Sequence, residues 1–259
     1  MQEAFDHCEA LVREHDKDRF LAALFASRDK RQALFALYAF DIEIARIPLI
    51  VRQPMAGEVR LQWWCEILAG DREEEARATP VALALCQTLQ NRRERIDPLE
   101  AMVEAHRADL YDDPIKTLSD LEDYAETVSA PVMDVAIRLL CGNSEKDAQE
   151  FVAHVSKALL LERVLRGAAN NVGRRMVSDQ VTVTAAELRE RVMFHLERAR
   201  ALLPSMPSEA WPAFLPLALV PLRLAKLGRS DSIPNWPQAD VPQWRRQWML
   251  WRAARRRKL

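Results

Sequence analysis

The 259-residue chain lacks the residue patterns that mark several common kinds of site. It has four cysteines, and no two of them form a CxxC pair. Such isolated cysteines argue against a zinc site and against a disulfide framework, and they fit a reducing compartment. No two of the five histidines stand three or four residues apart, so helical metal-ligand spacing is also missing. The sequence therefore predicts no metal site of its own.

Phosphate loops, a strong net charge and long apolar runs are missing too. None of the six glycines belongs to a glycine-rich phosphate loop, and no serine stands in a nucleophile elbow. The net charge of −1 does not favour a polyanion partner, so we expect no nucleic acid. The N-terminal residues lack the apolar core of a signal peptide. The most apolar run, residues 211–222, is short and interrupted by proline, so we expect no transmembrane helix.

Helical periodicity fills most of the chain. The only strand-like run is VTVT at 181–184, and elsewhere apolar residues recur at helical spacing. We predict one all-α domain over residues 1–259, in which all glycines but Gly167 separate helices and Pro131 opens one. The expected helices cover 30–47, 58–69, 80–92, 98–111, 117–128, 131–141, 144–168, 185–203, 208–227 and 241–254.

Four segments in order carry a family resemblance: RQALFALYAFDIEIARI (31–47), GEVRLQWWCEIL (57–68), LEDYAETVSAPVMDVAIRLLCG (121–142) and SKALLLERVLRG (156–167). Together they resemble the squalene/phytoene synthase family of prenyl transferases. This resemblance implies a single-domain helical bundle of the trans-isoprenyl diphosphate synthase type with a central cavity. It also implies condensation of two prenyl diphosphates, with Mg²⁺ held by carboxylates to neutralise the departing pyrophosphate.

The acids that hold Mg²⁺ in this family have no counterparts on the first of the two helices that carry them. Ala45, Arg46 and Leu49 occupy those positions. Asp41 and Glu43 do not replace them, because residues two apart on a helix differ by about 200° and point to opposite sides. A guanidinium at position 46 is always protonated, so it would repel Mg²⁺ and would accept an anion directly.

The second helix has lost its acids as well. After Arg166, the family's two aspartate positions hold Gly167 and Asn171. Glycine offers no ligand, and a neutral amide carbonyl is a poor sole ligand for a hard cation. We therefore predict no catalytic residue, and no cofactor unless an alternative set of acids binds Mg²⁺.

A further resemblance points to an acid-poor branch of the same superfamily. It rests on AFDIEIARI, RLQWW, LEDYAE and the segment 210–227. That branch acts in the assembly of respiratory complex I, which implies complex I subunits or assembly proteins as partners and no prenyl transfer. The implied location is cytoplasmic, on the inner face of the plasma membrane, or the matrix side in a mitochondrion.

Six residues of the family scaffold are candidates for binding a substrate or an isoprenoid-like lipid. For Arg31, Arg60 and Arg166, pairing with buried acids is at least as good an interpretation, and for Trp64 core packing is the favoured one. The candidates are Arg31, Tyr38, Arg46, Arg60, Trp64 and Arg166.

The C-terminal residues 244–259 combine seven Lys or Arg with no acid. Three tryptophans recur there at i, i+4 and i+7, which places them on one helical face. Tryptophans beside basic side chains suit an anionic membrane surface, while a docked terminal helix or a protein groove is the alternative. The candidates for membrane or partner contact are Trp244, Arg245, Trp248, Trp251 and Arg252.

Two alternative functions stay open. The chain would be an active prenyl transferase if displaced acids between Asp109 and Asp123 held Mg²⁺. It would be a lipid carrier or sensor if its cavity bound prenyl chains without reacting with them.

Overall fold

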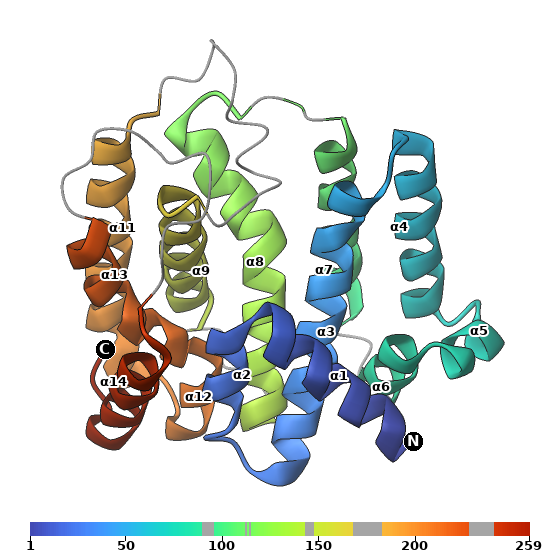
Figure 1. The fold of residues 1–259 in the computed structure, drawn as a ribbon, viewed down its shortest axis with the longest axis horizontal. Coiled ribbons are helices and arrows are strands. Elements are labelled where there is room, and N and C mark those ends of the chain that lie inside the picture. The colour runs from blue at the N-terminus through green and yellow to red at the C-terminus, as the bar shows by residue number, and fades with distance from the viewer. Residues whose placement is uncertain (90–95, 112, 114, 143–147, 168–182, 228–240) are drawn as a thin grey trace.

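The computed structural model describes residues 1–89, 96–111, 113, 115–142, 148–167, 183–227 and 241–259. Every regular element in these ranges is a helix, which confirms the all-α prediction (Figure 1). One set of buried apolar side chains extends from Ala4 to Ala253, so helices from both ends of the chain share a core.

Four long helices form the main body of the bundle (Figure 1). Helix α9 packs against both α8 and α11, and α3 packs against α8. The apolar stripe of each helix faces these neighbours, which is why the helices pack as predicted from their periodicity. The four are α3 (Arg28–Ile50), α8 (Leu118–Cys141), α9 (Ala148–Leu165) and α11 (Ala185–Leu202).

Pro131 does not open a new helix, contrary to the prediction from sequence. Helix α8 continues through it without a break. An internal proline removes one backbone hydrogen bond and costs about 3 kcal/mol. The buried side chains on either side of it, such as Val128 and Val132, belong to one apolar stripe. Burial of that whole stripe against the neighbouring helices offsets the cost.

Two N-terminal helices, which the sequence prediction did not include, cover the front of α3 (Figure 1). Helix α1 (Gln2–His15) buries Ala4, Cys8 and Val12, which lie four residues apart on one face. Helix α2 (Lys17–Ala23) follows after Asp16, whose carboxylate accepts a hydrogen bond from the backbone N–H of Arg19. This cap fixes the sharp change of direction between the two helices.

Gly57 lies inside α4 and not between helices, which corrects the prediction. A Cβ there would stand 2.3 Å from Leu110 Cδ2, so glycine permits close helix packing. Gly70 and Gly142 end their helices as predicted, while Gly173 and Gly228 fall outside the described residues. The elements between α3 and α8 in the chain are α4 (Pro54–Ala69), α5 (Glu73–Ala78), α6 (Pro80–Leu89), α7 (Ile96–Ala105) and the 3₁₀ helix η2 (His106–Leu110).

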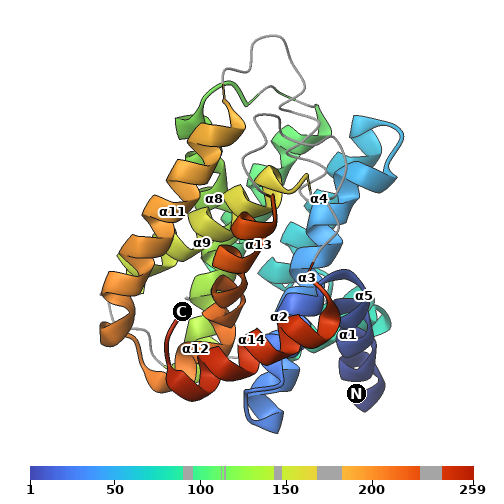
Figure 2. The same ribbon diagram turned by 60° about the vertical axis from the view of Figure 1, so that its left-hand side comes forward.

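The predicted helix over 208–227 is divided into short elements, because prolines recur along it. Length and composition alone would let Ser208–Leu227 cross a membrane, but 72% of its most apolar window is buried inside the bundle. Helix α14 then lies across α2 and η5 (Figure 2). The elements are η3 (Leu203–Ser205), η4 (Ser208–Ala210), α12 (Trp211–Phe214), η5 (Leu215–Leu219), α13 (Val220–Leu227) and α14 (Gln243–Arg256).

Candidate functional site

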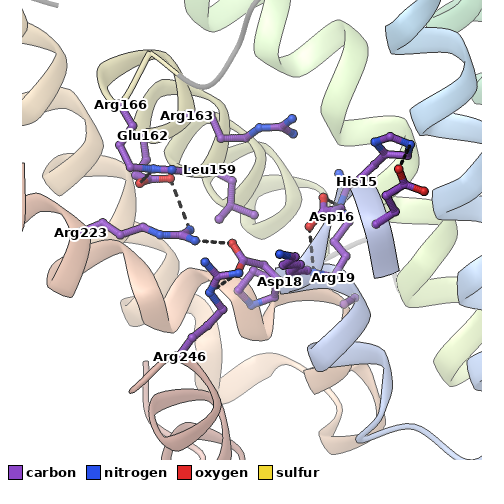
Figure 3. A pocket seen from close by; sticks show the side chains of 14 residues that line it. His15, Asp16, Asp18, Arg19, Leu159, Glu162, Arg163, Arg166, Arg223 and Arg246 are labelled. Carbon is purple, nitrogen blue, oxygen red and sulfur yellow. Dashed lines mark hydrogen bonds and ion pairs between the residues drawn. The ribbon is translucent and has the colours of Figure 1, made fainter. Parts of the chain in front are cut away.

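A cavity of about 380 Å³ lies between the N-terminal helices, α9 and the C-terminal elements (Figure 3). Among the residues that the structure describes, six Lys or Arg and four Asp or Glu side chains line it, and their formal charges sum to +2. Leu159, Ala213 and Pro216 are the apolar residues among the lining residues that the structure describes. This composition suits an anionic group better than a buried hydrocarbon chain.

Arg223 joins two acids at the floor of the cavity. Its Nη2 donates to Asp18 Oδ2 at 2.5 Å, and its Nη1 lies 3.8 Å from Glu162 Oε2 (Figure 3). Arg246 Nε lies 3.2 Å from Asp18 Oδ1, and Arg166 Nε donates to Glu162 Oε1. Glu162 and the three arginines are buried, and Asp18 is nearly so. Three guanidinium groups therefore surround two carboxylates.

This arrangement leaves the floor unsuited to a metal ion. Both carboxylates already face guanidinium groups, which compete with any cation for their oxygens. Burial raises the pKa of Glu162, although Arg223 and Arg166 oppose the rise. A carboxylate that resists ionisation is a weak ligand for Mg²⁺, because the cation requires the charged form.

Two cations that line the cavity are exposed, unlike the buried arginines of its floor. Lys17 and Arg163 are exposed, and no partner for either is found among the residues that the structure describes. Arg19, in contrast, donates to Asp41 and lies 3.7 Å from Asp16. An anion that entered the cavity would meet Lys17 and Arg163 without having to break an ion pair.

The positions that the sequence assigns to the family's acids carry no carboxylate where the structure describes them. Arg46 Nη1 lies 3.2 Å from Nε2 of His15, which lines the cavity. An arginine can only donate, so in a hydrogen bond between them His15 Nε2 is the acceptor. Ala45 has no ligand atom, Leu49 is 41% exposed near the end of α3, and Gly167 has φ +67 just after α9. Asn171 falls outside the described residues.

Two of the six proposed substrate-binding residues lie at the cavity. Arg166 lines it, and Arg46 reaches it through His15. Arg31 instead donates to the carbonyls of Leu24 at 3.0 Å and Ala26 at 3.1 Å, so it ties down the turn after α2.

The other three do not line the cavity, although Tyr38 contacts Arg19, which does. Tyr38 is buried with the Arg19 guanidinium 4.9 Å from its ring centroid, and burial raises the pKa of its phenol. Trp64 is buried and packs edge-on against Phe40 with ring centroids 5.0 Å apart. Arg60 is exposed on α4. Core packing accounts for the positions of the two aromatic residues.

The acids proposed as an alternative metal site have separate partners. Asp109 is fully buried, where Tyr124 donates to it at 2.7 Å and His106 Nδ1 lies 2.8 Å away. Asp120 caps α8, and Glu122 Oε1 lies 2.8 Å from Arg191 Nε. Asp112 is outside the described residues. Within those residues no group of three or more His, Cys, Asp or Glu is arranged to hold a metal.

The tail candidates are all exposed on α14. The exposed fractions of Trp244, Trp248 and Trp251 are 70%, 53% and 43%, and Arg245 and Arg252 are also exposed. The helix is nevertheless docked on the bundle by its opposite side. The terminal helix is therefore docked on the bundle, as one alternative predicted, and its three tryptophans are still accessible.

Sequence reasoning missed most of the cavity floor, although a signal was present. Glu162 and Arg166 stand four apart in the apolar run ALLLERVLRG, and Arg223 interrupts LALVPLRLAKL. Charged residues in such apolar surroundings require partners. The sequence does not say which partners, since Asp18 and Arg246 come from opposite ends of the chain.

Comparison with known proteins relates this geometry to a family. The model for squalene/phytoene synthase matches residues 12–178. Complex I assembly factor 6 of Bos taurus is 24% identical over 247 residues, which cover 87% of this chain and 74% of that protein. The Homo sapiens protein of the same name is 24% identical over 249 residues, with the same coverage.

Solved structures share the fold. A dehydrosqualene synthase superposes with a TM-score of 0.72 at 18% identity, covering 98% of this chain and 96% of that one. A squalene synthase from Alicyclobacillus acidocaldarius gives 0.68 at 21% identity, covering 88% and 94%. These likenesses confirm the predicted helical bundle of the trans-isoprenyl diphosphate synthase type. With the family model matching well over half of its residues, the chain belongs to the squalene/phytoene synthase family.

Proposed function

We propose that this protein is a non-catalytic member of its family and supports the assembly of respiratory complex I at a membrane surface. The observation that carries the proposal is the replacement of the family's acids by Ala45, Arg46, Leu49 and Gly167. Without carboxylates to hold Mg²⁺, the departing pyrophosphate would lack its counterion. The floor of the cavity supports the same conclusion, because its two acids are engaged by arginines.

The names of two similar proteins support the assembly role. The similar proteins of Bos taurus and Homo sapiens are named as assembly factors of the NADH dehydrogenase complex, and the match extends over most of both chains. The partners would then be subunits or assembly proteins of complex I. The site of action would be the cytoplasmic face of the inner membrane, or the matrix side in a mitochondrion.

Deletion of the gene tests the assembly role. Assembled complex I would be measured on native gels and by NADH oxidation in isolated membranes, with a second respiratory complex as the control. We expect a selective loss of complex I that the wild-type gene restores. Normal levels of complex I in the deletion strain would contradict the proposal.

A second candidate function, binding of a lipid with an anionic head, is favoured by the net positive cavity and the available Lys17 and Arg163. Native mass spectrometry of the purified protein with prenyl phosphates in the presence of EDTA tests it. Uptake should weaken in Lys17→Gln and Arg163→Gln and should persist in Arg198→Gln, which removes an exposed arginine paired with Glu150. An empty cavity under all conditions would exclude this function.

A further inference from the structure

Helix α14 has two opposite faces with different surroundings. Arg246, Leu250 and Ala253 are buried, and the first of these lines the cavity. At about 100° per residue, the centre of this buried face lies about 200° from the centre of the three tryptophans. The helix is therefore held on the bundle by one side, and the tryptophans point away from it.

The tryptophan face is unusually apolar for an exposed helix surface. Trp244 is 70% exposed, more than almost any other large apolar side chain that the structure describes. Trp248 and Trp251 stack with ring centroids 5.3 Å apart and an interplanar angle of 26°. The Arg255 guanidinium lies 5.3 Å from the Trp251 ring centroid. The three indoles thus form an apolar strip along one helical face, with a cation beside Trp251.

The charged side chains that α14 itself places beside this strip are all basic. Arg245 and Arg252 are exposed and flank the tryptophans on one side, and Arg255 and Arg256 extend the basic surface. No acid occurs from residue 241 to residue 259. Indole rings favour the headgroup region of a bilayer, where their apolar body and polar N–H are both accommodated, and arginines beside them attract anionic lipid.

We propose that α14 is a membrane-docking element that lies parallel to an anionic bilayer with Trp244, Trp248 and Trp251 in the headgroup region. The pairing of an apolar strip with an exclusively basic flank matches an anionic lipid surface, which is apolar below and negatively charged above. This inference specifies the membrane contact of the proposed function but rests on α14 alone, so it stands or falls separately from the role in complex I assembly.

The docked orientation has a consequence for the cavity. Arg246 projects from the side of α14 opposite to the tryptophans and contacts Asp18 at the cavity floor. A helix with its side chains is about 10 Å across, so the docked protein would hold its cavity about one helix diameter from the lipid headgroups. The cavity and the bilayer would then share α14 as a common wall.

Vesicle co-sedimentation of the full chain tests the proposal. Vesicles of phosphatidylcholine alone are compared with vesicles that also contain phosphatidylglycerol, at low and high salt. We expect binding to the anionic vesicles that weakens with salt. Each of Trp244→Ala and Trp248→Ala should weaken it about tenfold, from the apolar area withdrawn from lipid. Arg245→Gln and Arg252→Gln should each weaken it about fivefold.

Two controls separate docking from general changes of the surface. Tyr111→Ala removes a 54% exposed aromatic residue elsewhere, and Arg77→Gln removes an exposed arginine on α5. Both should bind within twofold of the wild type, and circular dichroism should show every variant folded. Three results would overturn the proposal: no binding to anionic vesicles, equal binding to neutral ones, or binding that the tryptophan substitutions leave unchanged. Self-association lost with the tryptophans, in the absence of vesicle binding, would assign the strip to a second copy instead.

Discussion

Removal of the Glu162 carboxylate should destabilise the protein strongly. Glu162 is 1% exposed and accepts a hydrogen bond from Arg166, while Arg223 Nη1 lies 3.8 Å from its second oxygen. In Glu162→Ala, Arg166 would lose the acceptor of its hydrogen bond, and Arg223 would lose one of the two carboxylates beside it. Breaking a buried ion pair by removing one partner costs about 3–5 kcal/mol, because the remaining charge is left uncompensated.

The glutamine variant separates charge from shape. Glu162→Gln keeps the volume and one acceptor oxygen, so it should cost about 1–3 kcal/mol. Burial already raises the pKa of Glu162, which means that its charged form is held at some expense and that the neutral amide recovers part of the loss. We therefore expect the order wild type, Glu162→Gln, Glu162→Ala in decreasing stability.

Urea unfolding followed by circular dichroism measures these differences. For a chain of this length about 1 kcal/mol shifts the melting temperature by about 2–4 °C, so Glu162→Ala should melt about 6–20 °C below the wild type. Glu150→Ala is the matched control, since Glu150 lies on the same helix with a 54% exposed side chain and a surface ion pair to Arg198. It should cost at most about 1 kcal/mol. Equal losses in Glu162→Ala and Glu150→Ala would refute the reasoning.

Three further predictions concern other parts of the bundle. Gly57→Ala would place a Cβ 2.3 Å from Leu110 Cδ2 and should lower the free energy of unfolding by about 1–3 kcal/mol in urea titrations; an unchanged midpoint would show that this contact relaxes freely. Burial lowers the pKa of His195 and of His154, so the unfolded chain binds more protons and stability should fall as the pH drops below about 6.5. In His195→Gln the dependence of melting temperature on pH between 7 and 5 should be shallower, and an identical dependence would count against the shift. Thr117→Ala removes the side-chain cap of α8 and should cost about 0.5–2 kcal/mol, whereas Thr117→Ser should restore most of it.

Much of the fold follows from the sequence because helical periodicity is a local property. Most of the predicted helices recur with ends shifted by a few residues. The errors have tertiary causes. Pro131 is tolerated because α8 is buried along its length, and Gly57 leaves room for the Leu110 side chain beside α4. Helix α1 was not predicted because its sequence is mostly polar. Only a narrow apolar stripe of it reaches the core.

Some features of the candidate site can likewise be predicted from the sequence, and others depend on tertiary packing. The predicted loss of the family's acids depends only on counting positions along the chain, so the sequence alone points to Ala45 and Arg46. The cavity network could not be identified, because Asp18 and Arg223 are 205 residues apart and nothing local links them. Likewise, periodicity placed the three tryptophans on one face, but only the packing of α14 decides that this face is the exposed one.

The absence of prenyl transfer is the central claim, and one assay tests it most directly. Purified protein would be incubated with farnesyl or geranylgeranyl diphosphate and Mg²⁺, and condensed hydrocarbon products would be sought by mass spectrometry with a family enzyme as the positive control. The account predicts no product above the protein-free blank. A condensed product that requires Mg²⁺ and disappears in Asp109→Asn would contradict it.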